Sequence, residues 1–131
     1  MADTVSTRPL IDKLGVRPGS RVALIDLEDL DFRRLLAERT DDITEGEPLA
    51  GSDLIFIGID DGHELHQLAF LRGQIVPNGA IWVVSRKGTA ATVRDVEVIE
   101  AAKSFGLVDN KVVAFSATRT SLRLVIPVAL R

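Results

Sequence analysis

Two runs of apolar residues, DLIFIGI at 53–59 and AIWVVS at 80–85, constrain the fold most strongly. A strand forms a near-continuous apolar run when both faces of its sheet are covered, which is the usual environment of a parallel strand. A third run, RVALID at 21–26, has a similar character and follows a turn at Pro18-Gly19. Segments with helical spacing separate the runs. This alternation predicts an α/β domain with a parallel sheet and right-handed crossovers.

The predicted helices are mostly short. We expect helices at about 9–14, 31–38 and 62–73, and a longer one that Thr92 caps and Gly106 ends. The inward face of this longer helix is predicted from apolar residues at helical spacing, namely Val93, Val96, Ile99, Ala102 and Phe105.

The remaining segments are connections and a terminal hairpin. The polar stretch 38–53 is expected to be a loop with at most a weak strand, and 77–79 a turn into the next strand. The apolar segments 111–117 and 121–127 flank 118–120, which predicts a β-hairpin. The predicted architecture is three-layer and Rossmann-like, with a mainly parallel sheet that ends in an antiparallel hairpin.

Composition excludes several classes of function. The 131 residues fit a single domain over 1–131, with 1–7 expected to be a flexible tail. The chain has no cysteine, which excludes disulfides, thiolate nucleophiles and cysteine-ligated zinc. A pI of about 5.3 disfavours nucleic-acid binding. No apolar run approaches the roughly 20 residues that span a bilayer, so we expect a cytoplasmic protein without a membrane partner.

Charge is unevenly distributed along the chain. Residues 1–60 hold 13 acids and 7 bases, whereas the remainder holds more bases than acids. This asymmetry permits a homo-oligomer or a local anion site, but it is also common as plain surface variation.

Three segments carry a resemblance to a known class of proteins. LGVRPGSRVALID, DLIFIGI and IVPNGAIWVVS resemble strands of class I S-adenosylmethionine-dependent methyltransferases, in which turns with proline and glycine precede the first and a late strand. Most of 12–126 also resembles a bacterial family of small proteins known as a domain of unknown function, through KLGVRPGSRVALID, WVVSRKG and GLVDNKVVAFSATRTSLRLV. The resemblance implies a truncated, methyltransferase-like fold and leaves the activity open.

The chain departs from the methyltransferase pattern after its first strand. Those enzymes have a glycine-rich loop there, because the backbone must approach the cofactor closely. Here no glycine lies between 20 and 45, and the loop carries four carboxylates: Asp26, Glu28, Asp29 and Asp31. Asp26 can occupy the place of the family's first acidic residue, while 38–53 replaces the segment that supplies the ribose-binding acid. We therefore predict no cofactor and disfavour S-adenosylmethionine.

Any ligand site is expected beyond the carboxyl ends of the parallel strands, at a switch in strand order. The loops that qualify are 26–31, 58–62 and 85–89. In the last loop, backbone N–H groups, a hydroxyl and two cations could bind an anion, although a solvated basic turn explains the same residues. The candidate crevice comprises Asp26, Asp60, Ser85, Arg86, Lys87 and Thr89.

Other chemistry-bearing residues have simpler explanations. His63 and His66 are weak metal candidates, because their spacing differs from that of the HExxH zinc motif and the start of an exposed helix explains them. Hydroxyls around Arg119, with Arg123 beyond, suit a hairpin turn and its polar face. Trp82 lies in an apolar strand and is expected in the core.

These observations predict a noncatalytic Rossmann-like binding or regulatory module that binds a protein or a small molecule. The alternative is a ligand sensor or enzyme that retains S-adenosylmethionine, another nucleotide or an anion in an altered site. The alternative requires Asp26, Asp60, Ser85 and Arg86 to converge in one crevice around a ligand-sized cavity.

Overall fold

The computed structural model describes residues 8–131, so the tail expected at 1–7 lies outside the described residues. The strands are β1 (Val22–Ile25), β2 (Ile43–Glu45), β3 (Ser52–Gly58), β4 (Ile75–Arg86), β5 (Val108–Ala114) and β6 (Arg119–Val125). The α-helices are α1 (Leu10–Lys13), α2 (Leu30–Ala37), α3 (Leu68–Arg72) and α4 (Asp95–Ser104). Short 3₁₀ helices are η1 (Gly62–Gln67), η2 (Gly88–Ala90) and η3 (Val128–Leu130). No helix formed by these described residues is long and apolar enough to cross a membrane.

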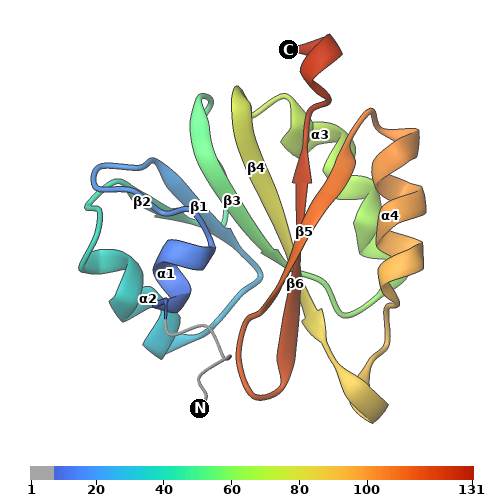
Figure 1. Cartoon of the computed structure of the whole chain (residues 1–131), viewed down its shortest axis with the longest axis horizontal. Helices are drawn as coiled ribbons and strands as arrows, with labels where there is room; N and C mark the ends of the chain where they lie inside the picture. The colour runs from blue at the N-terminus through green and yellow to red at the C-terminus, as the bar shows by residue number, and fades with distance from the viewer. Residues whose placement is uncertain (1–7) are drawn as a thin grey trace.

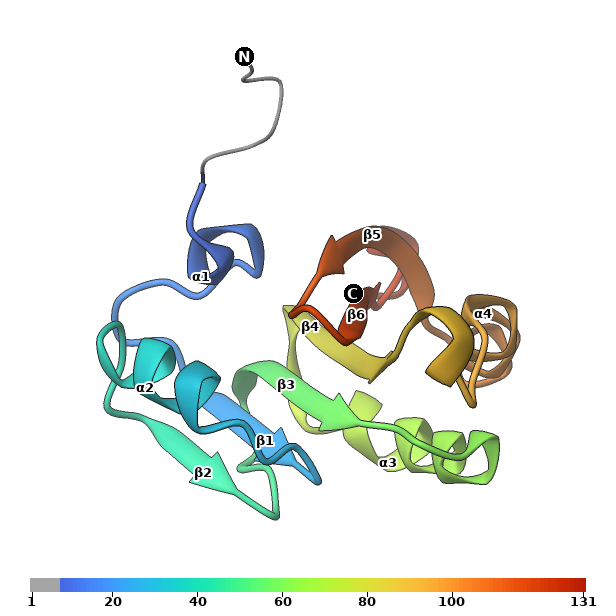
Figure 2. The same ribbon diagram turned by 90° about the horizontal axis from the view of Figure 1, so that it is seen from below.

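The strands form one sheet in the order β2-β1-β3-β4-β6-β5. The strands β1 to β4 pair in parallel, whereas β6 runs antiparallel to both β4 and β5. Helices α1 and α2 cover one face, and α3 and α4 cover the other (Figures 1 and 2). The predicted three-layer, mainly parallel architecture with a terminal hairpin is confirmed.

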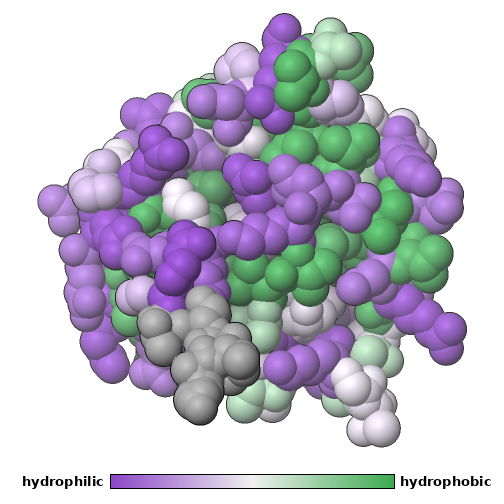
Figure 3. Space-filling view, viewed as in Figure 1, coloured by the Kyte–Doolittle hydropathy of each residue, from purple (hydrophilic) through white to green (hydrophobic). Residues whose placement is uncertain are grey.

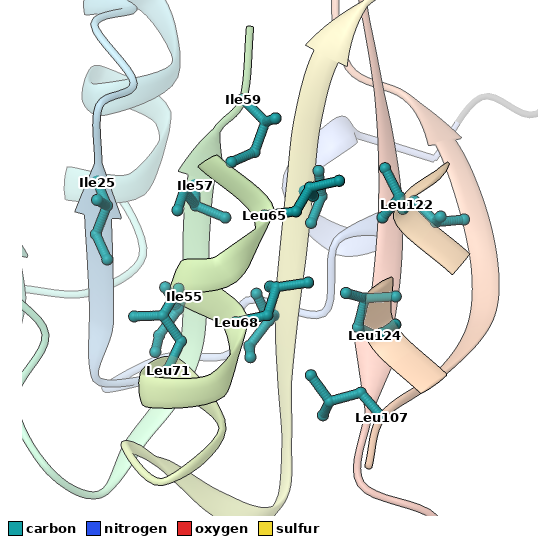
Figure 4. Close-up of a cluster of buried hydrophobic side chains, with 14 of the residues drawn as sticks. Ile25, Ile55, Ile57, Ile59, Leu65, Leu68, Leu71, Leu107, Leu122 and Leu124 are labelled. Atoms are coloured by element: carbon teal, nitrogen blue, oxygen red, sulfur yellow. The ribbon is translucent and has the colours of Figure 1, made fainter. Parts of the chain in front are cut away.

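Two apolar layers hold the helices to the sheet. On the face of α3 and α4, Ile55, Ile57 and Leu122 point from the strands toward Leu65 and Leu68 (Figure 4). All are nearly inaccessible to solvent. Burying one such side chain contributes about 1.5–3 kcal/mol to stability, so this layer is a large part of what holds the helices in place.

The other layer is aromatic. Trp82 is fully buried and lies parallel to Phe56, with ring centroids 6.4 Å apart. Phe32 of α2 meets Phe56 edge-on at 5.0 Å. The indole Nε1 of Trp82 donates to the carbonyl oxygen of Leu14 at 3.1 Å, so its polar group is satisfied inside the core. The core position predicted for Trp82 is confirmed.

The segment expected to be one helix at 62–73 is a 3₁₀ helix followed by a short α-helix. Its start is fixed by two reciprocal bonds. Asp61 Oδ1 accepts from the backbone of His63 at 2.8 Å, and Glu64 Oε1 accepts from the backbone of Asp61 at 2.8 Å. Such reciprocal bonds satisfy donors that a helix start leaves unpaired.

The turn predicted at 77–79 is instead a bulge inside β4. Ser52 pairs with Ile75 but Leu54 pairs with Ala80, so β4 contains extra residues at this point. A methyl group on Gly79 would lie 2.8 Å from the carbonyl oxygen of Asp53, which leaves room only for glycine.

The stretch 38–53 fits its prediction of at most a weak strand, whereas two boundaries and the position of one side chain differ from prediction. The polar stretch 38–53 contains β2, a parallel edge strand that is only three residues long. The helix α4 begins at Asp95 and Thr92 does not cap it, because the Thr92 hydroxyl donates to the carbonyl oxygen of Asp60. Val96 is 58% exposed, so it does not belong to the inward face. The hairpin turn lies before Arg119, where β6 already begins.

Candidate functional site

The three loops expected to form a site do lie at one edge of the sheet, because they follow the parallel strands β1, β3 and β4. The chain leaves β1 toward the face of α2 and leaves β3 toward the face of η1 and α3. Strand order therefore switches between β1 and β3, which is where a doubly wound sheet opens a ligand crevice.

In this chain the crevice is closed at its base. A methyl group on Gly58 would lie 2.3 Å from the carbonyl oxygen of Asp26, so the loop after β1 packs directly on the backbone of β3. Asp26 has φ +50°, a conformation that glycine usually supplies, and Leu27 is buried in the aromatic layer. Asp29 then caps α2, its Oδ1 accepting from the backbone of Phe32 at 3.0 Å.

A charge cluster lies over the ends of β3 and β4. Asp60 Oδ1 lies 3.3 Å from Arg86 Nε and 3.8 Å from Arg119 Nη1. Arg86 and Arg119 are opposite each other in the pairing of β4 with β6, so the hairpin positions the second guanidinium. The Asp60 carboxylate already occupies the place between two cations where an exogenous anion would bind.

The other predicted site residues do not converge with this cluster. Ser85 is buried within β4, and the side chain of Asp26 faces solvent. Lys87 and Thr89 are exposed, and the Lys87 backbone donates to the carbonyl oxygen of Thr118 at 3.1 Å. Of the six predicted residues, the structure brings Asp60 and Arg86 into contact.

The two histidines lie side by side in η1, His63 in its first turn and His66 in its last. Their ring centroids are 5.3 Å apart, and His66 Nδ1 lies 2.6 Å from the carbonyl oxygen of His63. This bond engages one ring nitrogen with the backbone. Within residues 8–131 no group of three or more His, Cys, Asp or Glu side chains could hold a metal ion.

A groove of about 410 Å³ lies beside the closed crevice, on the face of α3. Ile25 at the end of β1 forms part of its lining, Gly46–Pro48 form one wall, and His66–Leu71 form the other. Its size falls within the range of small-molecule sites, about 300–1,000 Å³. The groove therefore occupies the expected edge of the sheet but is built largely from other residues.

The exposed aromatic ring is the most unusual feature of the groove. Phe70 is 62% exposed, whereas its neighbour Leu71 is buried in the core. Glu47 at the opposite wall is exposed and forms no ion pair with another described residue. Sequence reasoning missed both. Phe70 falls outside the apolar face that Leu65, Leu68 and Leu71 define. This mismatch is the feature of the sequence that could have indicated an exposed ring at Phe70.

The fold is similar to those of solved methyltransferase structures. A SAM-dependent methyltransferase of Aquifex aeolicus matches with a TM-score of 0.68 at 12% identity, over 88% of this chain and 86% of that one. A protein of Thermoplasma acidophilum described as a methyltransferase matches at 0.67 and 7% identity, over 95% and 77%. An O-methyltransferase from neocarzinostatin biosynthesis, in complex with S-adenosylhomocysteine, matches at 0.53 and 16%, over 72% and 36%.

No family model matches the sequence, and no curated protein matches it either. At these identities the structural similarities establish the fold alone. The chain has a methyltransferase-like Rossmann fold.

Proposed function

We propose that this chain is a noncatalytic binding domain that holds a nucleoside in the groove between Gly46–Pro48 and α3. The observation that carries the proposal is the position of this groove, which lies at the carboxyl end of β1 beside a closed crevice. Solved neighbours are described as SAM-dependent, and one is in complex with S-adenosylhomocysteine, which supports a ligand with an adenosine part.

The groove lining suits the two halves of a nucleoside. The exposed ring of Phe70, with Pro48 and Ile25, offers an apolar surface for a planar base. The carboxylate of Glu47 can accept hydrogen bonds from two neighbouring ribose hydroxyls. Gln67 Nε2 donates to the carbonyl oxygen of Glu64 at 3.1 Å, which leaves its amide oxygen able to accept from an exocyclic amine.

The adjoining loop argues for a nucleoside rather than a nucleotide. The four carboxylates of 26–31 follow Ile25 directly and would repel a phosphate group. We therefore expect adenosine to bind more tightly than its monophosphate, and the difference to shrink as salt screens these charges.

Two features support a noncatalytic role. The carbonyl of Asp26 packs against Gly58 at the base of the switch point, and we expect this close packing to exclude the reacting part of a cofactor. The charged groups over β3 and β4 are paired with one another, through Asp60, Arg86 and Arg119. The domain is therefore proposed to bind its ligand without transforming it.

Titration calorimetry with adenosine on the wild type and two variants tests the proposal. Phe70→Ala removes the stacking surface, and because base stacking on an aromatic contributes about 1–3 kcal/mol, the affinity should fall about fivefold or more. Glu47→Gln should weaken binding less, since an amide still accepts one hydroxyl. Val96→Ala, an exposed apolar residue of α4, is the matched control and should leave the affinity unchanged. Wild-type protein that binds no nucleoside, or Phe70→Ala protein that binds as well as wild type, would refute the proposal.

A further inference from the structure

A second hollow, of about 400 Å³, lies at the opposite edge of the sheet from the proposed nucleoside groove. Its lining comes from the turn that leads into β1, from the first part of β3, from the bulge of β4, and from Arg123 of β6. Arg123 and Trp82 are opposite each other in the sheet. The hollow therefore adjoins the aromatic layer. Figure 3 shows this face of the molecule, with hydrophilic side chains across the centre of the view.

The hollow has cations without counterions. Arg17 and Arg123 line it, and neither forms an ion pair with any residue of 8–131. Lys111 is opposite Arg123 in the pairing of β5 with β6, and its Nζ donates to the carbonyl oxygen of Lys13 at 3.0 Å. Asp53 is the acid in the lining, and its Oδ2 already accepts from the backbone of Arg21 at 2.8 Å.

Electrostatics around Arg123 favour an incoming negative charge. Burial and the guanidinium of Arg131 lower the pKa of Arg123 below its ordinary value. A lowered pKa means that these surroundings disfavour the cationic form of Arg123, and a bound anion would offset that cost. Among residues 8–131 the Arg123 guanidinium makes one hydrogen bond, a long contact from Nη1 to Asn110 Oδ1 at 3.5 Å, so most of its donors are available.

The backbone around the hollow is fixed. Ser20 closes the turn twice, because its N–H donates to the Arg17 carbonyl at 3.0 Å and its Oγ accepts from the Arg17 N–H at 3.0 Å. On the other wall Gly79 packs on the backbone of Asp53. A fixed turn holds Arg17 near the same hollow as Arg123, so less ordering is needed on binding.

We propose that this hollow binds the phosphate or carboxylate group of a small molecule through Arg17 and Arg123. Guanidinium groups bind both oxyanions with paired, charge-assisted hydrogen bonds. The site is independent of the proposed nucleoside groove, since the two lie at opposite edges of the sheet and share no residue.

The test is titration with inorganic phosphate and, separately, with citrate, followed by NMR of the labelled full chain. Binding should shift the amide signals of the 17–20 turn and of Arg123. Arg123→Gln and Arg17→Gln should each lower the affinity about tenfold, because each removes charged donors. Arg94→Gln, an exposed arginine before α4, is the matched control and should not change it. The Arg17 variant alters an exposed side chain, so it remains informative if Arg123→Gln fails to fold.

The two probes separate the two anion classes. Tighter binding of phosphate assigns the site to phosphorylated molecules, and tighter binding of citrate assigns it to carboxylates. Either result supports the proposal if each arginine variant that folds weakens binding. Absence of shifts with both anions, or shifts that neither variant alters, would overturn it.

Discussion

The closed crevice makes Gly58→Ala the most informative single substitution. The new methyl carbon would lie 2.3 Å from the Asp26 carbonyl oxygen and 3.1 Å from its carbonyl carbon, and both are backbone atoms in a packed loop. Neither can move as the end of a flexible side chain does. The loop after β1 must therefore separate from β3.

Overpacking of this kind costs about 1–3 kcal/mol of folding free energy. For a domain of this size the thermal midpoint should fall by about 2–8 °C for each kcal/mol. The matched control is Gly73→Ala, where the nearest atom would be 3.6 Å away and φ is −77°. That variant should be unchanged or more stable by about 0.4–1 kcal/mol, because alanine restricts the unfolded chain.

The assay is thermal and urea unfolding of wild type and both variants, followed by circular dichroism. A Gly58→Ala protein as stable as Gly73→Ala would refute the packing of the loop on β3. The closed crevice, and the noncatalytic role that depends on it, would then lose their main support.

Four further measurements test separate contacts. Asp29→Ala removes the cap of α2 and should cost about 0.5–2 kcal/mol in urea unfolding; no loss would exclude the cap. Asp26→Val should cost about 1–2 kcal/mol more than Asp26→Gly, because a β-branched residue resists positive φ, and equal stabilities would contradict the left-handed conformation. The single tryptophan, Trp82, should emit at short wavelength and resist quenching by iodide until the protein unfolds. Asp60→Asn should cost less than about 1 kcal/mol, because its pair with Arg86 is half-exposed; a larger loss would mean that the cluster supports the fold.

The sheet was largely predictable because its strands are buried on both faces. The run 53–59 has no polar face, and neither does 80–85, so their apolar character alone identified them. β2 lacks this signal, since it is an edge strand of three residues and none of them is fully buried. The bulge at 77–79 has the composition of a turn, and only its pairing with β3 distinguishes the two.

The site was less predictable because it depends on pairing between distant segments. Asp60 and Arg86 were expected at one edge from strand order alone, and they do meet. Arg119 joins them only because of the register between β4 and β6. The groove depends on how the loop after β2 faces α3, a relationship that leaves no local pattern in either segment.

The most direct test of the proposed function compares the affinities of adenosine and S-adenosylmethionine by calorimetry. The two ligands share the nucleoside but differ in the methionine part, which would need the crevice that Asp26 and Gly58 close. We predict dissociation constants that agree within about threefold, a difference below 1 kcal/mol. S-adenosylmethionine that binds 100-fold or more tightly, by about 2.7 kcal/mol, would show that the methionine part is held at the switch point. That result would contradict the closed crevice and favour a retained cofactor site.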